Sequence, residues 1–188
     1  MPPTEDRSTP TRLRPPTVAD AGAIWSLVRD DAELDLNSQY AYLVLCRDFA
    51  TGSLIAESAD GEIVGFAVGY RPPARPDTIF VWQIAVDRRE RGRGLGRALL
   101  DELVDRSSQT GVRWLEATVT PSNLPSQRLF RSLAGSRGAE LAVEPLFDEH
   151  LFSDGHEEER LVRIGPFDRR SARAPDSHAE SAAPGGAH

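Results

Sequence analysis

The chain has 188 residues and a formal net charge of −7 at pH 7, and every one of its 22 basic residues is an arginine. The length suits one domain, and the negative charge argues against general binding to nucleic acids and is compatible with a small cationic substrate. No apolar run approaches the roughly 18 residues of a membrane span, and the start is polar and proline-rich instead of signal-like, so we expect a cytoplasmic protein.

The two ends of the chain lack the side chains that build a core. Residues 1–10 and 168–188 contain no Val, Ile, Leu, Phe, Trp or Tyr. Burial therefore cannot offset the entropy that these segments would lose on ordering. We expect two flexible tails around a single domain over residues 11–167.

A short strand at 12–14 and two helices are expected at the start of this domain. Thr17 and Asp20 have the spacing of a capping box. Apolar residues then recur on one helical face, at Ala21, Ile24, Trp25 and Val28. A second helix starts near Ser38 and shows the same spacing at Tyr42, Leu45, Cys46 and Phe49. This pattern assigns the single cysteine to packing instead of catalysis.

The middle of the domain is rich in strand patterns. Residues 54–58 and 62–70 predict a hairpin closed at Asp60-Gly61, a strong turn signal. A fourth strand over 78–86 alternates two faces, with Phe80, Trp82, Ile84 and Val86 against Ile79, Val81 and Ala85. A fifth strand, a helix and two closing strands follow at 114–120, 123–133, 140–143 and 158–164. The predicted order is β-αα-βββ-α-β-α-ββ.

A run of glycines and arginines separates the fourth strand from a helix that starts at residue 95. The glycines let the backbone turn tightly with its N–H groups outward, and the helix start and the arginines add positive charge. A side chain at Gly94 or Gly96 is expected to crowd these N–H groups. The run predicts a pyrophosphate site, although a solvated turn is the alternative for so short a segment. It comprises Arg91, Gly92, Arg93, Gly94, Leu95, Gly96 and Arg97.

The spacing of this run excludes two common phosphate loops. A Walker A loop needs Gly-Lys-Ser/Thr, and a dinucleotide fingerprint needs G-x-G-x-x-G after the first strand of a βαβ unit. Taken as Arg91-x-x-Gly94-x-Gly96, the run resembles the R/Q-x-x-G-x-G/A coenzyme A motif of the GNAT superfamily of N-acetyltransferases. The resemblance implies an α/β fold whose mixed, mostly antiparallel sheet has six or seven strands and four flanking helices. It also implies acetyl-CoA as cosubstrate and no metal.

In that superfamily the fourth and fifth strands splay apart, and the acetyl-pantetheine arm pairs with the exposed edge of the fourth strand. Here Ile84, Ala85 and Val86 would form that edge, and a backbone N–H there would polarise the thioester carbonyl. Asn123 stands where the family places a residue that bonds the pantetheine. It also suits a plain helix N-cap, and the two roles are compatible.

One position departs from the family pattern. Many members carry a tyrosine on the helix after the fifth strand, in a pattern like L-Y-x-x-x-G, and this tyrosine protonates the departing thiolate. Here the pair is Leu129-Phe130, and phenylalanine has no proton to donate. Either water or another group serves, or the thiolate leaves unaided, since a thiol pKa of about 8.5 makes it a fair leaving group. Phe130 itself is expected to pack in the core.

Three further segments resemble the L-2,4-diaminobutyrate acetyltransferases of ectoine biosynthesis, a likeness that covers about residues 11–167. They are the run LDLNSQYAY at 34–42, Trp82-Gln83, and His156 followed by three glutamates. The resemblance implies that the 4-amino group of diaminobutyrate accepts the acetyl group, which gives the precursor of a compatible solute, and that the protein is a homodimer. The residues that we expect at the substrate are Asp35, Asn37, Tyr40, Trp82 and Glu158.

Diaminobutyrate carries two ammonium groups and one carboxylate, so its site needs more negative than positive partners. Acidic groupings at 30–35 and 157–159 supply them, although a run of charges is usually a solvated face. Attack needs a neutral amine, and an alkyl ammonium with a pKa of about 10 must lose its proton to a base. We expect Glu158 or Glu157 as that base, directly or through water, with His156 next. Trp82 would stack on the ammonium or the acetyl arm, or it is simply a core residue.

Two other functions share the same coenzyme site. The acceptor would then be a protein N-terminus or another small amine, which only the acceptor residues discriminate. The missing tyrosine favours instead a module that binds acyl-CoA without turnover. Release of thiol in the presence of diaminobutyrate would exclude such a module.

Overall fold

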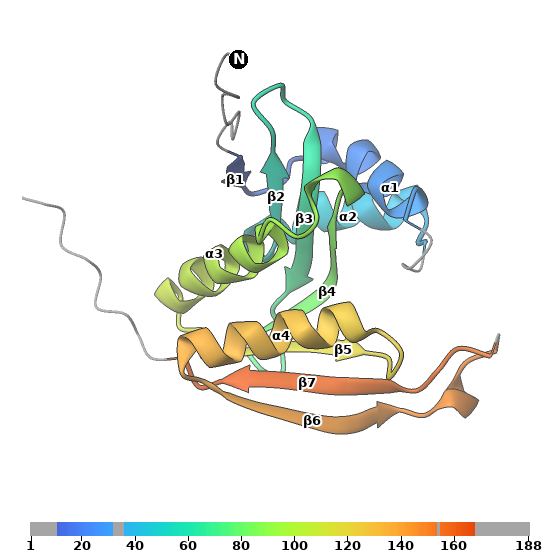
Figure 1. Ribbon diagram of the computed structural model, residues 1–188, viewed down its shortest axis with the longest axis vertical. Coiled ribbons are helices and arrows are strands. Elements are labelled where there is room, and N and C mark those ends of the chain that lie inside the picture. Colours follow the sequence, from blue (N-terminus) through green and yellow to red (C-terminus); the bar gives the residue numbers. More distant parts are fainter. Residues whose placement is uncertain (1–10, 32–35, 154, 168–188) are drawn as a thin grey trace, which may run out of the picture.

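A computed structural model of the chain describes residues 11–31, 36–153 and 155–167. Within these residues seven strands form one sheet, with four α-helices around it (Figure 1). The strands are β1 (Arg12–Arg14), β2 (Leu54–Glu57), β3 (Ile63–Tyr70), β4 (Thr78–Val86), β5 (Trp114–Val119), β6 (Glu140–Phe147) and β7 (Glu159–Gly165). The helices are α1 (Ala21–Arg29), α2 (Gln39–Asp48), α3 (Leu95–Gln109) and α4 (Leu124–Arg137). None of the helices in the described segments is long and apolar enough to cross a membrane.

The predicted fold class and order of elements are confirmed, and the differences concern element ends. α4 runs on to Arg137, where Gly138 in the left-handed conformation ends it. β6 continues to Phe147. Phe49, expected on the apolar face of the second helix, is instead the C-cap of α2 and is 36% exposed. The two predicted tails, 1–10 and 168–188, lie outside the described residues, as does Asp35, which is expected at the substrate.

The sheet is mixed because one pair of neighbouring strands is parallel. Its order is β1-β2-β3-β4-β5-β7-β6, and β4 and β5 are the parallel pair, while all other neighbours are antiparallel. α3 and α4 cover one face and α1 and α2 cover the other (Figure 1). The short helices are η1 (Val18–Asp20), η2 (Ala50–Gly52), η3 (Arg88–Glu90) and η4 (Glu149–Leu151).

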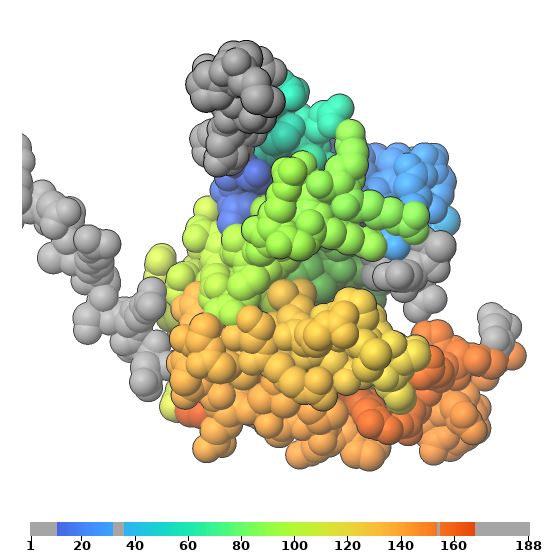
Figure 2. All heavy atoms as spheres, in the orientation of Figure 1, coloured from blue at the N-terminus to red at the C-terminus, as the bar shows by residue number. Residues whose placement is uncertain are grey.

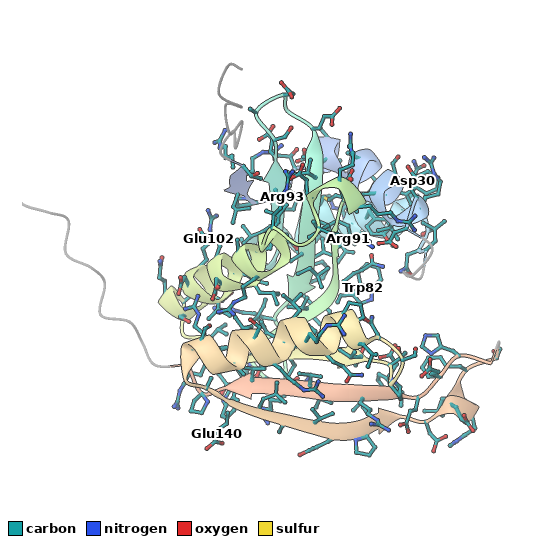
Figure 3. The ribbon with its side chains drawn as sticks, viewed as in Figure 1. Asp30, Trp82, Arg91, Arg93, Glu102 and Glu140 are labelled. Carbon is teal, nitrogen blue, oxygen red and sulfur yellow. The ribbon has the colours of Figure 1, made fainter. Side chains whose placement is uncertain are left out.

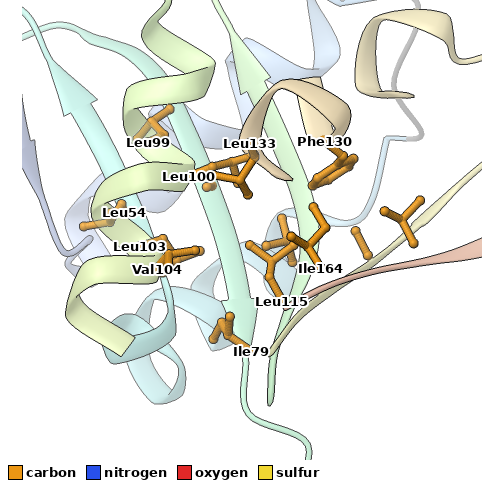
Figure 4. Close-up of a cluster of buried hydrophobic side chains, with 14 of the residues drawn as sticks. Leu54, Ile79, Leu99, Leu100, Leu103, Val104, Leu115, Phe130, Leu133 and Ile164 are labelled. Atoms are coloured by element: carbon orange, nitrogen blue, oxygen red, sulfur yellow. The ribbon is translucent and has the colours of Figure 1, made fainter. Parts of the chain in front are cut away.

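The larger core lies between the sheet and the helices α3 and α4 (Figure 4). Leu99, Leu100 and Leu103 recur on one face of α3 and are fully buried, as the 3.6-residue period requires. Leu133 and Phe130 of α4 belong to the same cluster, on the same face of the sheet. Each such side chain stabilises the fold by about 1.5–3 kcal/mol relative to an exposed one, so this core fixes how α3 and α4 sit on the strands.

The start of the domain is fixed by the buried carboxylate of Asp20. Arg14 of β1 donates to it from both terminal guanidinium nitrogens at 2.9 Å, and the Thr17 backbone N–H donates at 2.6 Å. The predicted pairing of Thr17 with Asp20 is therefore confirmed. Hydrogen bonds from Arg14 stabilise the charged carboxylate and lower the pKa of Asp20 to about 2.

The predicted alternation of β4 is wrong beyond Val81, because the strand contains a β-bulge. Val81 pairs with Gly69 of β3 and Gln83 pairs with Val68, so Trp82 is an extra residue without a counterpart. Ile79 and Val81 thus face the α3–α4 core, whereas Ala85 packs with α1 and α2. A side chain at Gly69 would collide with the Phe80 carbonyl, so glycine is required for β3 to approach the strand here.

β4 leaves β5 at the same place. The parallel pairing runs only from Thr78 opposite Trp114 to Val81 opposite Ala117. From residue 83 to 86 β4 remains paired with β3 on its other side. The predicted splay of the fourth and fifth strands is therefore confirmed, and it starts at the bulge.

Replacement of Phe130 tests whether its ring belongs to the core. The side chain is 2% exposed, so Phe130→Ala is expected to lower the free energy of unfolding by about 3–5 kcal/mol, whereas Phe130→Tyr, which keeps the ring, should be tolerated. Leu43→Ala removes a 41% exposed side chain from α2 and should cost less than about 1 kcal/mol. Denaturant unfolding of the three variants measures this, and equal losses for the two alanine variants would show that Phe130 is not a core residue.

Candidate active site

Two cavities open on the part of β4 that β5 has left. The loop cavity, of about 610 Å³, is lined by the glycine-rich loop, the edge of β4 and the start of α4. The carboxylate cavity, of about 470 Å³, is lined by β4, β5 and residues 155–157 and 159. Figure 2 shows the surface hollowed between the green segment that leads into α3 and the yellow start of α4. Ile84, Asn123 and Ser126 line both cavities, so the two meet at the bare edge of β4.

The loop cavity gathers most of the residues expected to hold the coenzyme. Gly92 and Gly94 have φ values of +77° and +81°, a conformation that other residues adopt only with strain. Gly94 is the N-cap of α3, whose first turn contains no acidic residue and directs its N–H groups outward. Of the residues expected to bind the coenzyme, those that line this cavity are Ile84, Ala85, Val86, Arg91, Gly92, Gly94, Leu95, Gly96, Arg97 and Asn123.

Crowding by the protein is not what requires glycine in this loop. A Cβ atom on Gly94 would meet no protein atom within 4 Å, and one on Gly96 would lie at an ordinary 3.5 Å from Val86. Backbone conformation requires glycine at positions 92 and 94. Gly96 has no positive φ, so only an incoming ligand could require its lack of a side chain.

Carboxylates hold the arginines of this loop. Arg91 donates from Nε to the Val86 carbonyl at 3.1 Å and pairs with Asp31, a carboxylate that is 6% exposed at the end of α1. Arg97 pairs with Asp101 at 2.7 Å. Arg93 pairs with Glu90 at 2.9 Å and does not line the cavity. In the view of Figure 3, Trp82 lies between Arg91 and the start of α4.

α4 begins at this site with a side-chain cap. The Asn123 Oδ1 accepts a hydrogen bond from the Ser126 backbone N–H at 3.0 Å, which confirms the expected N-cap. Asn123 also lines both cavities, so its second expected role, in bonding the pantetheine, is geometrically compatible with the cap. Arg128, which belongs to no recognisable sequence motif, adds a further cation to the loop cavity wall.

An aromatic ring and two side-chain amides form one wall of the carboxylate cavity. Trp82 and Gln83 line it from β4, and Asn37 lines it from the segment before α2. Tyr42 is fully buried, donates its hydroxyl to Gln83 Oε1 at 2.8 Å, and lies with its ring centroid 5.9 Å from that of Trp82. Burial raises the pKa of Tyr42, which keeps this donor protonated. Tyr40, expected at the substrate, is 71% exposed and does not line the cavity.

The opposite wall carries the acidic residues. Glu157 lines the cavity and accepts a hydrogen bond from the Ser122 N–H at 3.1 Å. Glu159 lines it as well, with a side chain that is 18% exposed. Glu158, the first candidate for the base, does not line the cavity and pairs with Arg160 at 2.8 Å. Side chains alternate along an extended chain, and this period could have pointed to Glu157 and Glu159 together.

His156 also lines this cavity. Its Nδ1 lies 2.7 Å from the Glu157 carbonyl oxygen, and its ring stacks on Phe152 with centroids 4.5 Å apart. A carbonyl oxygen can only accept, so Nδ1 carries the proton and donates. The neutral ring therefore has its lone pair on Nε2, which lies 3.8 Å from Glu159 Oε1. That arrangement suits proton uptake next to a carboxylate.

Comparisons with known proteins agree with this fold. A model described as the acetyltransferase (GNAT) family matches residues 20–135, and the chain belongs to that family. It is 48% identical over 162 residues to the L-2,4-diaminobutyric acid acetyltransferase of Nocardia farcinica, with 86% of this chain and 83% of that protein covered. It is 52% identical over 154 residues to that of Streptomyces coelicolor, with 81% and 91% covered. Within this family, the chain groups with the L-2,4-diaminobutyric acid acetyltransferases.

Solved structures agree with this placement. The diaminobutyrate acetyltransferase from Paenibacillus lautus, solved in complex with its substrate L-2,4-diaminobutyric acid and coenzyme A, superposes with a TM-score of 0.81 at 40% identity, covering 86% of this chain and 98% of that one. Ard1 from Thermoplasma volcanium has a TM-score of 0.67 at 21% identity, covering 82% of this chain and 97% of that one. The second likeness shows the shared fold alone.

Paired glycine substitutions separate coenzyme binding from backbone strain. Gly94→Val forces a β-branched residue into a positive φ and is expected to raise the Michaelis constant for acetyl-CoA more than about tenfold. Gly111→Val is the matched control, because Gly111 has a φ of +94° and equally open surroundings. Both variants should lose similar stability, and only the first should lose affinity. Wild-type affinity in Gly94→Val would show that the loop does not bind the coenzyme.

Proposed function

We propose that this protein transfers the acetyl group of acetyl-CoA to the 4-amino group of L-2,4-diaminobutyrate, a step of ectoine biosynthesis. The observation that carries the proposal is the match over 86% of the chain to a diaminobutyrate acetyltransferase solved with that substrate and coenzyme A. Two cavities that meet at one bare strand edge give the geometry that such a transfer needs. A thioester enters from one side and an amine from the other.

The loop cavity is the donor side. The outward N–H groups at the start of α3 and the nearby arginines would hold the pyrophosphate. The pantetheine arm would then pair with the backbone of Ile84, Ala85 and Val86, because β5 does not pair with this part of β4. A backbone N–H of this edge, aimed at the thioester carbonyl, would stabilise the oxyanion of the tetrahedral intermediate.

The carboxylate cavity is the acceptor side. Glu157 and Glu159 give it the negative charge that a doubly cationic amine needs, and Trp82 offers a ring face to an ammonium. The base comes from this wall. His156 can take the proton of the ammonium at Nε2 with Glu159 beside it to stabilise the imidazolium, or Glu157 can take it through water. Glu158, the candidate favoured by the sequence, takes part only if its pair with Arg160 opens.

The setting of the enzyme is part of the proposal. We place it in the cytoplasm, in the response to osmotic stress, and as a homodimer. Support for the homodimer comes from β6, which forms an edge of the sheet and exposes Val143, Leu146 and Phe147 by 43–49%. Paired sheet edges or apolar faces of two copies would cover these side chains.

A thiol-release assay over a panel of amines tests the substrate. Acetyl-CoA is offered with diaminobutyrate, ornithine, lysine and a peptide with a free N-terminus, and diaminobutyrate is expected to have the highest kcat/KM. Cys46 will not interfere, because it is 3% exposed and burial raises its pKa to about 11. A preference for the peptide would favour an N-terminal acetyltransferase, and tight acetyl-CoA binding without thiol release would favour a non-catalytic module.

The base is found by comparing single variants across pH. Glu157→Gln, Glu158→Gln, Glu159→Gln and His156→Gln are assayed with diaminobutyrate over about pH 7 to 10. The variant that lacks the base should lose the most turnover near neutrality and recover as pH rises, because the neutral amine increases about tenfold per pH unit below its pKa of about 10. Wild-type profiles in all four variants would exclude this wall as the source of the base. Acetyl-CoA affinity should stay unchanged throughout.

A further inference from the structure

The proposed reaction leaves a negative charge on the coenzyme sulfur, and Phe130 has no hydroxyl to stabilise it. We propose that Ser126 of α4 donates a hydrogen bond to the departing thiolate. This inference deepens the proposed function, because it concerns the same acetyl transfer. It assigns a catalytic role to a residue that no sequence motif marks.

The position of Ser126 meets both requirements of such a donor. It lines the loop cavity and the carboxylate cavity, together with Ile84 and Asn123, and so lies where thioester and amine would meet. Ser126 also precedes Phe130 by four residues on α4, which places both on one face of the helix, one turn apart. The serine hydroxyl therefore stands one turn closer to the helix start than the missing phenol would.

The hydroxyl of Ser126 is available for this bond. Its backbone N–H is taken by the Asn123 side chain, but among residues 11–31, 36–153 and 155–167 its hydroxyl makes no hydrogen bond. The other hydroxyl groups near the two cavities are either already hydrogen-bonded or line only one cavity. That of Tyr42 is committed to Gln83, and Thr118 and Thr120 line only the carboxylate cavity.

Electrostatics at this point also favour a negative sulfur. Ser126 lies in the first turn of a 14-residue helix, where the peptide dipoles are positive. In the transfer, the base first takes one proton from the ammonium and passes it to solvent. The neutral amine nitrogen then forms a bond to the acetyl carbon, the base takes a second proton from that nitrogen, and the C–S bond breaks with its electron pair on sulfur. Ser126 keeps its proton and shares it in a hydrogen bond with the thiolate, which takes up a proton from water after release.

Removal of the hydroxyl tests the assignment. Ser126→Ala should lower kcat about 10- to 100-fold, the effect of losing a hydrogen bond to a charged group, with the Michaelis constant for acetyl-CoA within about threefold of wild type. Ser126→Thr keeps a hydroxyl and should recover most of the rate. Ser108→Ala, on α3 and away from both cavities, is the matched control and should retain wild-type kinetics.

A change of leaving group separates a catalytic from a structural role. With acetyl-selenocoenzyme A the leaving selenolate is a weaker base than a thiolate and needs less stabilisation, so the defect of Ser126→Ala should shrink. A helix that had merely shifted would give the same defect with both donors. Wild-type kcat in Ser126→Ala, no recovery in Ser126→Thr, or equal defects on sulfur and selenium would each overturn the proposal.

The same measurements distinguish failure of the inference from failure of the proposed function. Each variant is compared with wild type on the amine that wild type acetylates fastest. If that amine is not diaminobutyrate, the substrate proposal fails while the ratio of variant to wild type still reports on Ser126. If diaminobutyrate is the best substrate and the ratio stays near one, only the role of Ser126 is lost.

Discussion

One extra residue in β4 decides the architecture of this site. Trp82 has no partner on β3, so the residues that follow it face the opposite side of the sheet from the side that a regular alternation would give them. The pairing of β4 with β5 also ends at this point. A sheet interior normally satisfies every backbone N–H and C=O, but here a strand in the middle of the sheet has a bare edge. Both cavities lie against that edge, so the bulge is what lets two substrates approach one another through the plane of a sheet.

Local features of the sequence predict most of the fold. The apolar spacing of α1 and α2, the Asp60-Gly61 turn and the glycine-rich loop before α3 each act within a few neighbouring residues, so their structure follows from the sequence alone. The bulge was not predictable in this way, because a strand with an extra residue shows nearly the same apolar pattern until its partner is known. The wrong face for Ala85 follows from that single missing fact.

The acceptor site was harder to predict than the donor site for a related reason. The coenzyme loop is one continuous segment, whereas the carboxylate cavity is assembled from the segment before α2, from β4 and β5, and from the approach to β7. Which of three consecutive glutamates points inward depends on the register of β7. Ser126 carries no sequence signal at all, because a serine in the first turn of a helix is ordinary, and only its place between two cavities distinguishes it.

The ion pairs around the coenzyme loop have a further chemical consequence. Arg91, Arg93 and Arg97 are all arginines, as is every other basic residue of the chain. A guanidinium stays protonated at any physiological pH, while a lysine amine titrates more readily and is a target of acetylation. An enzyme that holds a reactive thioester beside several cations thus has no lysine that could intercept the acetyl group. Its positive charges attract the donor without competing with the acceptor, and the protein is protected from modifying its own basic side chains.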